Sequence, residues 1–352
     1  MAGDLAAALP EADAPVRVRG AGTKLAWARG EPAAELSTEG LDEIVEHNVG
    51  DLTAVLEAGV PLARAQEKFA QEGQMLALDP PDRGATIGGV VATNDSGPLR
   101  SRYGGARDLV VGMRVALADG TVAKSGGKVI KNVAGYDLGK LFVGSFGTLG
   151  AILEVSVRLH PLPPDTASAV GRSEEPGALS RAALALSHAK LEQMGLDVRW
   201  EDGAGAILAR FGGAAAPPQA EAAQRLLREA GVETEIVEDD DALWHAQRDA
   251  QRSPAGLVVK VSALQTDLPE LLGIARDRGA TLAGRAGLGL HWLRLDDGDH
   301  AGLVEALRGR WTAAVLDRPA GLEVERDGTL DPGARLLADR VKERFDPEGR
   351  LI

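Results

Sequence analysis

The chain of 352 residues contains no cysteine and few aromatic side chains, which make up 3% of the residues. Without cysteine the chain has no disulfide, no thiolate nucleophile, no cysteine-ligated zinc and no iron–sulfur cluster of its own. Its six histidines lie nine or more residues apart, so no pair has the spacing of helical metal ligands. We therefore predict no metal site, and carboxylates, hydroxyls and bound cofactors are left as the available chemistry.

Long hydrophobic runs and positive charge are also scarce. No apolar run reaches the roughly 18 residues of a membrane span. The 52 acidic residues exceed the 39 basic ones and leave a net charge of −13, which repels nucleic acid and anionic lipid. The first residues, MAGDLAAALPEADAP, have no basic segment ahead of their apolar stretch, which argues against a secretory signal. We expect a cytoplasmic protein, peripheral to the membrane only through partners, with no nucleic-acid partner and no direct membrane insertion.

The length and the 44% apolar content indicate two globular domains. In the first half, LTAVLEAG (52–59) is typical of a strand, and PLARAQEKFAQEG (61–73) has helical spacing between a proline and a glycine. Asp119 and Gly120 join two further strands, and this pair favours a type I′ hairpin turn. The strand in GAILEVSVRLHPLPP (150–164) ends in three prolines, so we predict domains at 1–164 and 165–352.

The second half alternates helices and strands more plainly. We predict helices over 176–195, 217–231, 267–279 and 299–309, and strands over 204–211, 233–237, 256–262 and 289–295. This alternation is typical of an α+β or ferredoxin-like sheet that is backed by helices.

Glycine is abundant, and fifteen of the 44 glycines lie between Gly84 and Gly150. Ten of these fifteen lie in the runs ATIGGVVATNDSG (85–97), GGKVIKNVAGYDLGKL (126–141) and GSFGTLGAI (144–152). Such crowding indicates backbone that closely approaches a ligand or adopts positive φ. Upstream, RGAGTK (19–24) is either a concave anion site with Arg19 or Lys24 nearby, or a glycine turn between strands. It has neither the Gly-Lys-Ser/Thr ending of a Walker loop nor the spacing of G-x-G-x-x-G.

Five segments within residues 15–164 occur in the same order as in a known protein family. They are VRVRGAGTK, DLTAVLEAGVPLARAQ, LALDPPDRGATIGGVVATNDSGPLRSRYGGARDLVVGMRVALADG, GGKVIKNVAGYDLGKL and GSFGTLGAI. The chain resembles the FAD-binding subunit of glycolate oxidase, within the flavoprotein superfamily of vanillyl-alcohol oxidase and p-cresol methylhydroxylase (PCMH). VKERFDPEGRLI (341–352) is similar to the family's C-terminal segment. The resemblance implies an α+β fold: a PCMH-type FAD-binding domain of two α/β subdomains, then a smaller ferredoxin-like α+β domain of the FAD-linked oxidase kind.

The resemblance also implies where FAD binds, largely through glycine-rich backbone. The implied contacts are Arg19, Gly20, Ala21, Gly22, Thr23, Lys24, Thr86, Ile87, Gly88, Gly89, Ala92, Thr93, Asn94, Gly97, Arg102, Tyr103, Gly104, Gly147, Gly150 and Ile152. Covalently flavinylated relatives often carry a histidine in the first glycine loop or a cysteine in the second. Because this first loop has Thr23 and Lys24 and the chain has no cysteine, we expect non-covalent FAD.

Three residues are weak candidates for catalysis. Lys131 and Tyr136, in KNVAGYDL (131–138), could reach a flavin or a carboxylate substrate, while the structural alternative packs Tyr136 in an interface. His291 is a conceivable base for the α-proton of a hydroxy acid. The catalytic subunit of this enzyme type, as the resemblance implies, uses a clustered histidine site that this sequence does not display.

Three functions follow from the resemblance. In the favoured one, the chain is the FAD-binding subunit of a multi-subunit glycolate oxidase, an FAD-dependent oxidoreductase that acts on CH–OH groups. It would convert a small 2-hydroxy acid to the 2-oxo acid together with a catalytic flavin subunit and an iron–sulfur subunit. The alternatives are a free-standing 2-hydroxy-acid dehydrogenase or oxidase and a non-catalytic assembly scaffold.

Overall fold

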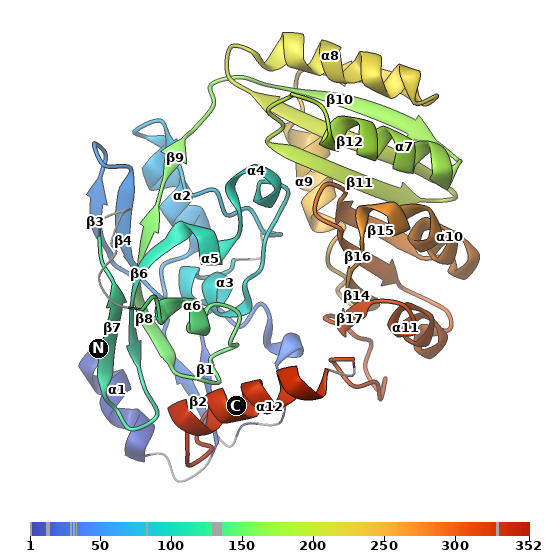
Figure 1. The fold of residues 1–352 in the computed structure, drawn as a ribbon. Helices are drawn as coiled ribbons and strands as arrows, with labels where there is room; N and C mark the ends of the chain where they lie inside the picture. Colours follow the sequence, from blue (N-terminus) through green and yellow to red (C-terminus); the bar gives the residue numbers. More distant parts are fainter. Residues whose placement is uncertain are drawn as a thin grey trace. The chain divides into compact units, whose positions relative to one another are not determined.

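The computed structural model describes residues 2–11, 15–28, 30, 32, 34–81, 84–128, 136–328 and 331–352. The chain divides into two compact units, which are visible in Figure 1. Unit 1 comprises Met1–Ser96, Gly104–Leu162 and Leu330–Ile352, and unit 2 comprises Gly97–Tyr103 and Pro163–Thr329. The main division lies close to the predicted boundary at residue 164. Two segments depart from the predicted domains, because the C-terminal segment belongs to unit 1 and Gly97–Tyr103 belongs to unit 2.

Unit 1 combines short helices with one larger sheet and two small ones. Its helices are α1 (Ala2–Glu11), η1 (Leu25–Trp27), α2 (Leu62–Ala70), α3 (Ile87–Thr93), α5 (Ala106–Leu109), α6 (Gly139–Phe142) and α12 (Pro332–Phe345). Its strands are β1 (Val16–Arg19), β2 (Ala34–Ser37), β3 (Ile44–Asn48), β4 (Thr53–Glu57), β5 (Gln74–Met75), β6 (Val110–Ala116), β7 (Val122–Gly126), β8 (Ala151–Arg158) and β9 (His160–Pro161). The larger sheet is antiparallel in the order β3-β4-β8-β6-β7, whereas β1 and β2 pair in parallel.

Helix α3 lies against β4 and β8 of the larger sheet, and Gly88 permits this close approach. A Cβ at Gly88 would come 2.7 Å from Cβ and 2.9 Å from the carbonyl oxygen of Ala58. The backbone N–H of Gly88 donates to that oxygen at 2.7 Å. Thr86 caps the helix by accepting a bond from the N–H of Gly89 at 3.3 Å, and Asn94 ends it in the left-handed region, with φ of 49°. A residue with a side chain at position 88 would push α3 off the sheet.

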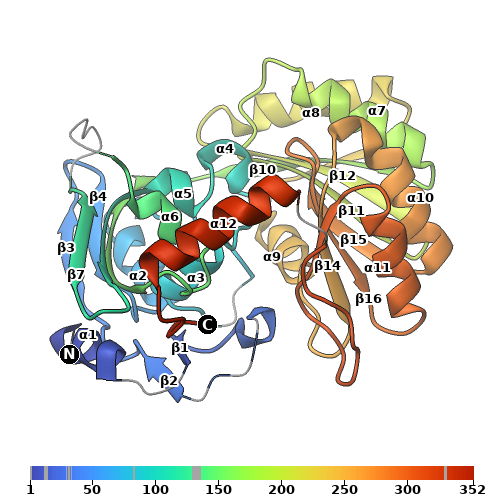
Figure 2. The ribbon, with the colours of Figure 1, turned by 60° about the horizontal axis from the view of Figure 1, so that its bottom comes forward.

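The C-terminal segment returns to β1 (Figure 2). Leu351 forms a parallel bridge with Val16, whose N–H donates to Arg350 O at 2.7 Å and whose carbonyl accepts from Ile352 N at 3.1 Å. Lys342 on α12 stabilises this arrangement, because its Nζ donates to the carbonyl oxygens of Thr148 and Leu351 at 2.8 and 2.6 Å. The strand that leads into the first glycine loop is thus flanked by β2 and by the end of the chain.

Unit 2 is built on one eight-stranded sheet in which every pairing is antiparallel. Its helices are α4 (Arg100–Tyr103), α7 (Pro176–Ser187), α8 (Ala216–Glu229), α9 (Asp241–Asp249), η2 (Gln265–Asp267), α10 (Leu268–Arg278) and α11 (His300–Arg308). Its strands are β10 (Thr166–Ser173), β11 (Gly195–Glu201), β12 (Ala204–Gly212), β13 (Glu233–Val237), β14 (Leu257–Ser262), β15 (Thr281–Arg285), β16 (Leu290–Leu295) and β17 (Thr312–Val315).

The strand order shows two ferredoxin-like halves side by side. The elements β10-α7-β11-β12-α8-β13 form the first βαββαβ unit, and β14-α10-β15-β16-α11-β17 form the second. The sheet order is β13-β10-β12-β11 in the first half, and the second half continues it as β15-β16-β14-β17. The predicted α+β class and ferredoxin-like sheet are confirmed, and the sheet has eight strands because the motif occurs twice.

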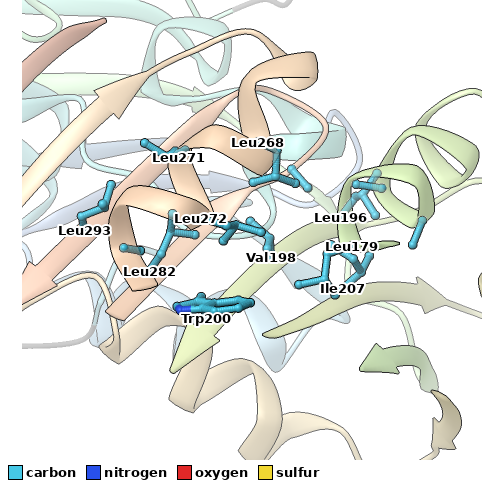
Figure 3. Close-up of a cluster of buried hydrophobic side chains, with 14 of the residues drawn as sticks. Leu179, Leu196, Val198, Trp200, Ile207, Leu268, Leu271, Leu272, Leu282 and Leu293 are labelled. Carbon is cyan, nitrogen blue, oxygen red and sulfur yellow. The ribbon is translucent and has the colours of Figure 1, made fainter. Parts of the chain in front are cut away.

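The main core of unit 2 lies between one face of this sheet and the helices α7, α8, α10 and α11. Figure 3 shows part of it, where Leu179 of α7 and Leu272 of α10 lie near Val198 of β11. Helix α9 packs on the opposite face, where Gln247 donates to Oδ2 of Asp197 at 3.0 Å. A single sheet is therefore covered on both faces, and its strands are correspondingly apolar.

Two local predictions need correction. The helix predicted over 176–195 ends at Ser187, and the alternating segment from Gly195 begins strand β11. The hairpin between β6 and β7 is not type I′, because Gly120 has a positive φ of 82° whereas Asp119 does not. Asp119 instead accepts a bond from the N–H of Thr121 through Oδ1 at 2.9 Å, which stabilises the turn locally.

Lys342→Met tests the attachment of the C-terminal segment. We expect the free energy of unfolding to fall by about 1–3 kcal/mol, because two carbonyl oxygens and the carboxylate of Asp346 lose a donor. Denaturant titration checks this, with Lys68→Met at an exposed position of α2 as the control. Equal effects of the two substitutions would contradict the assignment.

Candidate cofactor-binding site

An open hollow of about 520 Å³ lies in unit 1 where segments distant in sequence converge. The described lining comes from the β1–η1 region, from α3 with Thr86, and from the loop before β8. The lining residues are Arg17, Val18, Arg19, Gly20, Ala21, Gly22, Thr23, Lys24, Leu25, Ala28, Thr86, Gly89, Ala92, Thr93 and Phe146.

The first glycine loop rests directly on the start of α3. A Cβ at Gly20 would overlap Oγ1 of Thr86, so only glycine allows the loop to pass this point. Gly22 has a φ of 74°, which a side chain would also disfavour. The loop therefore exposes backbone N–H groups with little side-chain bulk, as an anion site requires.

The loop before β8 forms another part of the wall. The N–H of Phe146 donates to the carbonyl of Ala92 at 2.8 Å, and the N–H of Gly144 donates to that of Val91 at 3.1 Å. Phe146 has a φ of 57°, an unusual conformation for a residue with a bulky side chain. These two bonds to α3 maintain the strained conformation and place Phe146 on the hollow.

The electrostatics of the hollow oppose the overall charge of the chain. Among the described lining residues three are cationic and none carries a carboxylate, although the net charge is −13. Arg17 donates through Nη2 to the carbonyl of Gly30 at 2.5 Å, Arg19 pairs through Nε with Glu35 at 2.9 Å, and Lys24 pairs with Asp95 at 3.3 Å. The hollow can thus accept an anion such as a diphosphate.

Ten of the predicted FAD contacts line this hollow. They are Arg19, Gly20, Ala21, Gly22, Thr23, Lys24, Thr86, Gly89, Ala92 and Thr93. Ile87 is fully buried, Gly88 faces Ala58 and Asn94 ends α3, so these three support the helix from behind or from its end.

The other predicted contacts lie outside the described lining. Gly147 packs against Val18, with φ of 79°, and Gly150 and Ile152 belong to the start of β8 and its approach. Gly104 lies in the turn before α5. A residue with a side chain does not fit there, because its Cβ would meet Asp108. Gly97, Arg102 and Tyr103 belong to unit 2, where Arg102 donates to Oε2 of Glu192 at 3.0 Å.

The weak catalytic candidates do not converge. Tyr136 is 91% exposed, and Lys131 lies outside the described residues. His291 is 1% exposed and shares a strand face with Leu293 and Leu295 of the main core. Burial, with the Arg285 guanidinium as a further cause, lowers the pKa of His291 to about 4. Of these residues, neither Tyr136 nor His291 lines the hollow.

The sequence analysis missed five lining residues: Arg17, Val18, Leu25, Ala28 and Phe146. Arg17 and Val18 belong to the alternating strand β1, which leads directly into the glycine loop. This position next to the loop could have indicated Arg17. Phe146 stands inside the run GSFGTLG, but its positive φ is a property of the folded chain. Within the described ranges, no group of three or more histidine, aspartate or glutamate side chains is arranged to hold a metal ion.

Comparison with known proteins identifies the cofactor. A glycine-lined hollow with a cationic lining suits a nucleotide cofactor, and residues 3–126 match the family described as FAD binding domain. This part of the chain is therefore similar to FAD binding domains of the PCMH type, and FAD is the cofactor that the match supports.

Several curated relatives match this same region. Glycolate oxidase subunit GlcE of Escherichia coli (strain K12) is 37% identical over 151 residues, which are 42% of this chain and 43% of that protein. Mitochondrial D-lactate dehydrogenase (cytochrome) of Arabidopsis thaliana is 41% identical over 123 residues, 35% of this chain and 22% of that protein. Glycolate oxidase subunit GlcD of Bacillus subtilis (strain 168) is 38% identical over 152 residues, which are 42% of this chain and 32% of that protein. The match thus spans less than half of each relative.

The similarity of the fold extends further along the chain than the similarity of sequence. A solved structure of alkyldihydroxyacetonephosphate synthase aligns with 99% of this chain and 73% of its own, with a TM-score of 0.73 at 15% identity. A second structure of that enzyme gives a TM-score of 0.72 at 13% identity. Both establish the fold of the chain. Among the helices in the described ranges, none has the length and hydropathy needed to cross a bilayer.

Gly88 and Gly89 are adjacent but have different neighbours, so their substitutions should differ. Gly89→Val adds bulk on the hollow, where only Thr86 Oγ1 lies within 4 Å of the new Cβ, and we expect a folded protein that loses FAD. Gly88→Ala should instead destabilise the fold by about 1–3 kcal/mol, because Ala58 occupies the space. Flavin absorbance per chain and thermal unfolding measure the two effects. Stoichiometric flavin in folded Gly89→Val protein would refute this placement.

His291 should make stability depend on pH. The pKa of His291 is about 4 in the folded chain and about 6.5 in the unfolded chain. Between these two pH values His291 is therefore protonated in the unfolded chain and neutral in the folded chain. Stability relative to a His291→Leu variant should therefore fall as pH falls, by about 2–3 kcal/mol between about pH 7 and pH 4.5. Denaturant titrations of both proteins across this range measure the difference. A constant difference would show that His291 does not titrate in this way.

Proposed function

We propose that the chain is the FAD-binding subunit of a multi-subunit oxidase of small 2-hydroxy acids, with glycolate as the leading substrate. The observation that carries the proposal is the match of the region around the hollow to two proteins named glycolate oxidase subunits. Matches to D-lactate dehydrogenases and to a D-2-hydroxyglutarate dehydrogenase support the same substrate class, a 2-hydroxy acid. The reaction would convert the CH–OH group of the acid to a carbonyl.

Bound FAD supplies the two-electron acceptor for such an oxidation. The residues of this chain have binding roles in the proposal. Backbone N–H groups of the loop from Gly20 to Lys24, together with Arg19, would hold the diphosphate. Gly20 and Gly89 leave room for the cofactor, and Phe146 contributes an apolar wall. No covalent link is proposed, because the chain has no cysteine and no histidine among the described lining residues.

The proposed complex assigns substrate chemistry and onward electron transfer to partners. Neither described candidate base is among the lining residues of the hollow: His291 is buried in unit 2, and Tyr136 is exposed on unit 1. A second flavin subunit would therefore bind the hydroxy acid, and an iron–sulfur subunit would receive the electrons. Any association with a membrane would take place through these partners.

A second candidate function is a free-standing 2-hydroxy-acid dehydrogenase. It is supported by the 41% identity to a D-lactate dehydrogenase whose name indicates no subunit. This candidate requires the chain to bind and oxidise the acid without a partner. A scaffold without turnover is the remaining alternative, and it requires no reduction of bound flavin by a hydroxy acid.

Anaerobic absorbance spectra distinguish these functions. We expect the purified chain to bind FAD and the flavin to stay oxidised when glycolate or D-lactate is added. Adding the catalytic flavin subunit and the iron–sulfur subunit should then give reduction by glycolate, and Gly89→Val should remove this chain's share of the flavin. Bleaching of the isolated chain would establish the free-standing enzyme instead. A complex with unchanged turnover when this chain lacks FAD would favour the scaffold.

A further inference from the structure

A buried ion pair joins two walls of the hollow. Nζ of Lys24 lies 3.3 Å from Oδ2 of Asp95, and the two side chains are 6% and 4% exposed. The other carboxylate oxygen of Asp95 accepts a bond from the N–H of Ser96 at 2.9 Å, which orients the carboxylate. The ring of buried Trp27 lies 5.8 Å from the same Nζ. Lys24 is thus held on the protein side of the hollow by contacts with the folded chain.

The position of this pair gives it a role in the geometry of the site. Lys24 ends the first glycine loop, whereas Asp95 follows Asn94, the residue that ends α3. At the other end of the helix, Gly20 begins the loop and rests on Thr86. The loop is therefore attached at both ends of α3. The helix residues Gly89, Ala92 and Thr93 line the hollow between these two attachments.

Breaking the Lys24–Asp95 pair costs more free energy than breaking the ion pairs of Arg19. Arg19 is 32% exposed and meets Glu35 and Glu39, which are 40% and 52% exposed, so water screens both interactions. Arg19 can turn toward an incoming anion at small cost. Lys24 cannot, because its departure would leave the carboxylate of Asp95 buried without a counter-charge.

We infer that Lys24 and Asp95 are a positioning pair that sets the spacing between the first glycine loop and α3 before FAD binds. The backbone of the loop and Arg19 then meet the diphosphate, and Lys24 is not its counter-ion. The inference rests on FAD as the cofactor of the proposed function. It involves no hydroxy acid and no partner subunit, so its test is independent of whether glycolate is the substrate.

The direction in which two single substitutions change the Kd for FAD separates this role from direct phosphate binding. If the pair positions the loop, Lys24→Met and Asp95→Asn both lower the fraction of binding-competent protein, and each raises the Kd for FAD on the order of tenfold. If Lys24 is a phosphate ligand, Asp95→Asn frees its charge and tightens FAD binding, while Lys24→Met weakens it. Titration of the FAD-free full chain with FAD, followed by flavin fluorescence, measures each Kd.

Additivity and salt provide further measurements. The double variant Lys24→Met/Asp95→Asn should bind FAD no more weakly than either single variant, because both substitutions remove the same interaction. Lys24→Arg should restore most of the affinity, since it returns a cation to Asp95. The loss in Lys24→Met should persist at high salt, whereas the loss in Arg19→Met should shrink as salt screens the exposed charge.

Hydrogen exchange of the FAD-free protein tests the geometry without any cofactor. The double variant removes both buried charges of the Lys24–Asp95 pair, so it should fold even if a single variant does not. We expect faster exchange in residues 16–28 and 84–96 and unchanged exchange in strand β8 of unit 1, which reports that this unit is folded. Wild-type exchange in both segments together with wild-type FAD affinity would overturn the inference. Tighter FAD binding by Asp95→Asn would also overturn it.

Discussion

The close packing of α3 on the sheet of unit 1 is the constraint on which the cofactor site depends. Gly88 lets the helix approach Ala58, and the hydrogen bond from its N–H to the Ala58 carbonyl is 2.7 Å long. Other walls of the hollow are then attached to this helix. The first glycine loop rests on Thr86, and the loop before β8 bonds to the carbonyls of Val91 and Ala92. A shift of α3 would therefore move these walls together.

The distribution of charge matters more at the hollow than the total charge does. The chain carries −13 overall, yet Arg17, Arg19 and Lys24 lie on the hollow. Interactions between exposed charges are largely screened beyond about 8 Å at physiological salt, so a bound diphosphate experiences the charges beside the hollow more than the net charge of the chain. The buried pair of Lys24 and Asp95 adds shape to the site, while the exposed Arg19 can supply adjustable charge.

Unit 2 illustrates how a repeated motif makes a broad sheet. Each ferredoxin-like half places its two main helices on the same face, and the halves join at β11 and β15. The main core of unit 2 fills the space between this face and the four helices. His291 belongs to that face, which explains why a histidine near a glycine-rich turn is buried rather than available to a substrate. Helix α9 connects the halves and covers part of the other face.

Local sequence patterns determined much of the fold and the general nature of the site. The apolar segment 52–59 predicted β4, the proline and glycine around 61–73 predicted α2, and the glycine loop at 19–24 lies on the hollow. These signals are local, because periodicity, caps and positive φ depend on a few consecutive residues.

Only the tertiary structure decided which glycines serve the hollow and which serve packing. Gly88 and Gly89 are indistinguishable in sequence, yet one faces Ala58 and the other lines the hollow. The pairing of Lys24 with Asp95 and the return of Leu351 to β1 join residues that are far apart in the chain. The sequence by itself therefore determined many of the elements, and its resemblance to a flavoprotein family indicated the cofactor. The folded chain decided the neighbours of each residue, because long-range packing brings side chains together irrespective of their separation in sequence.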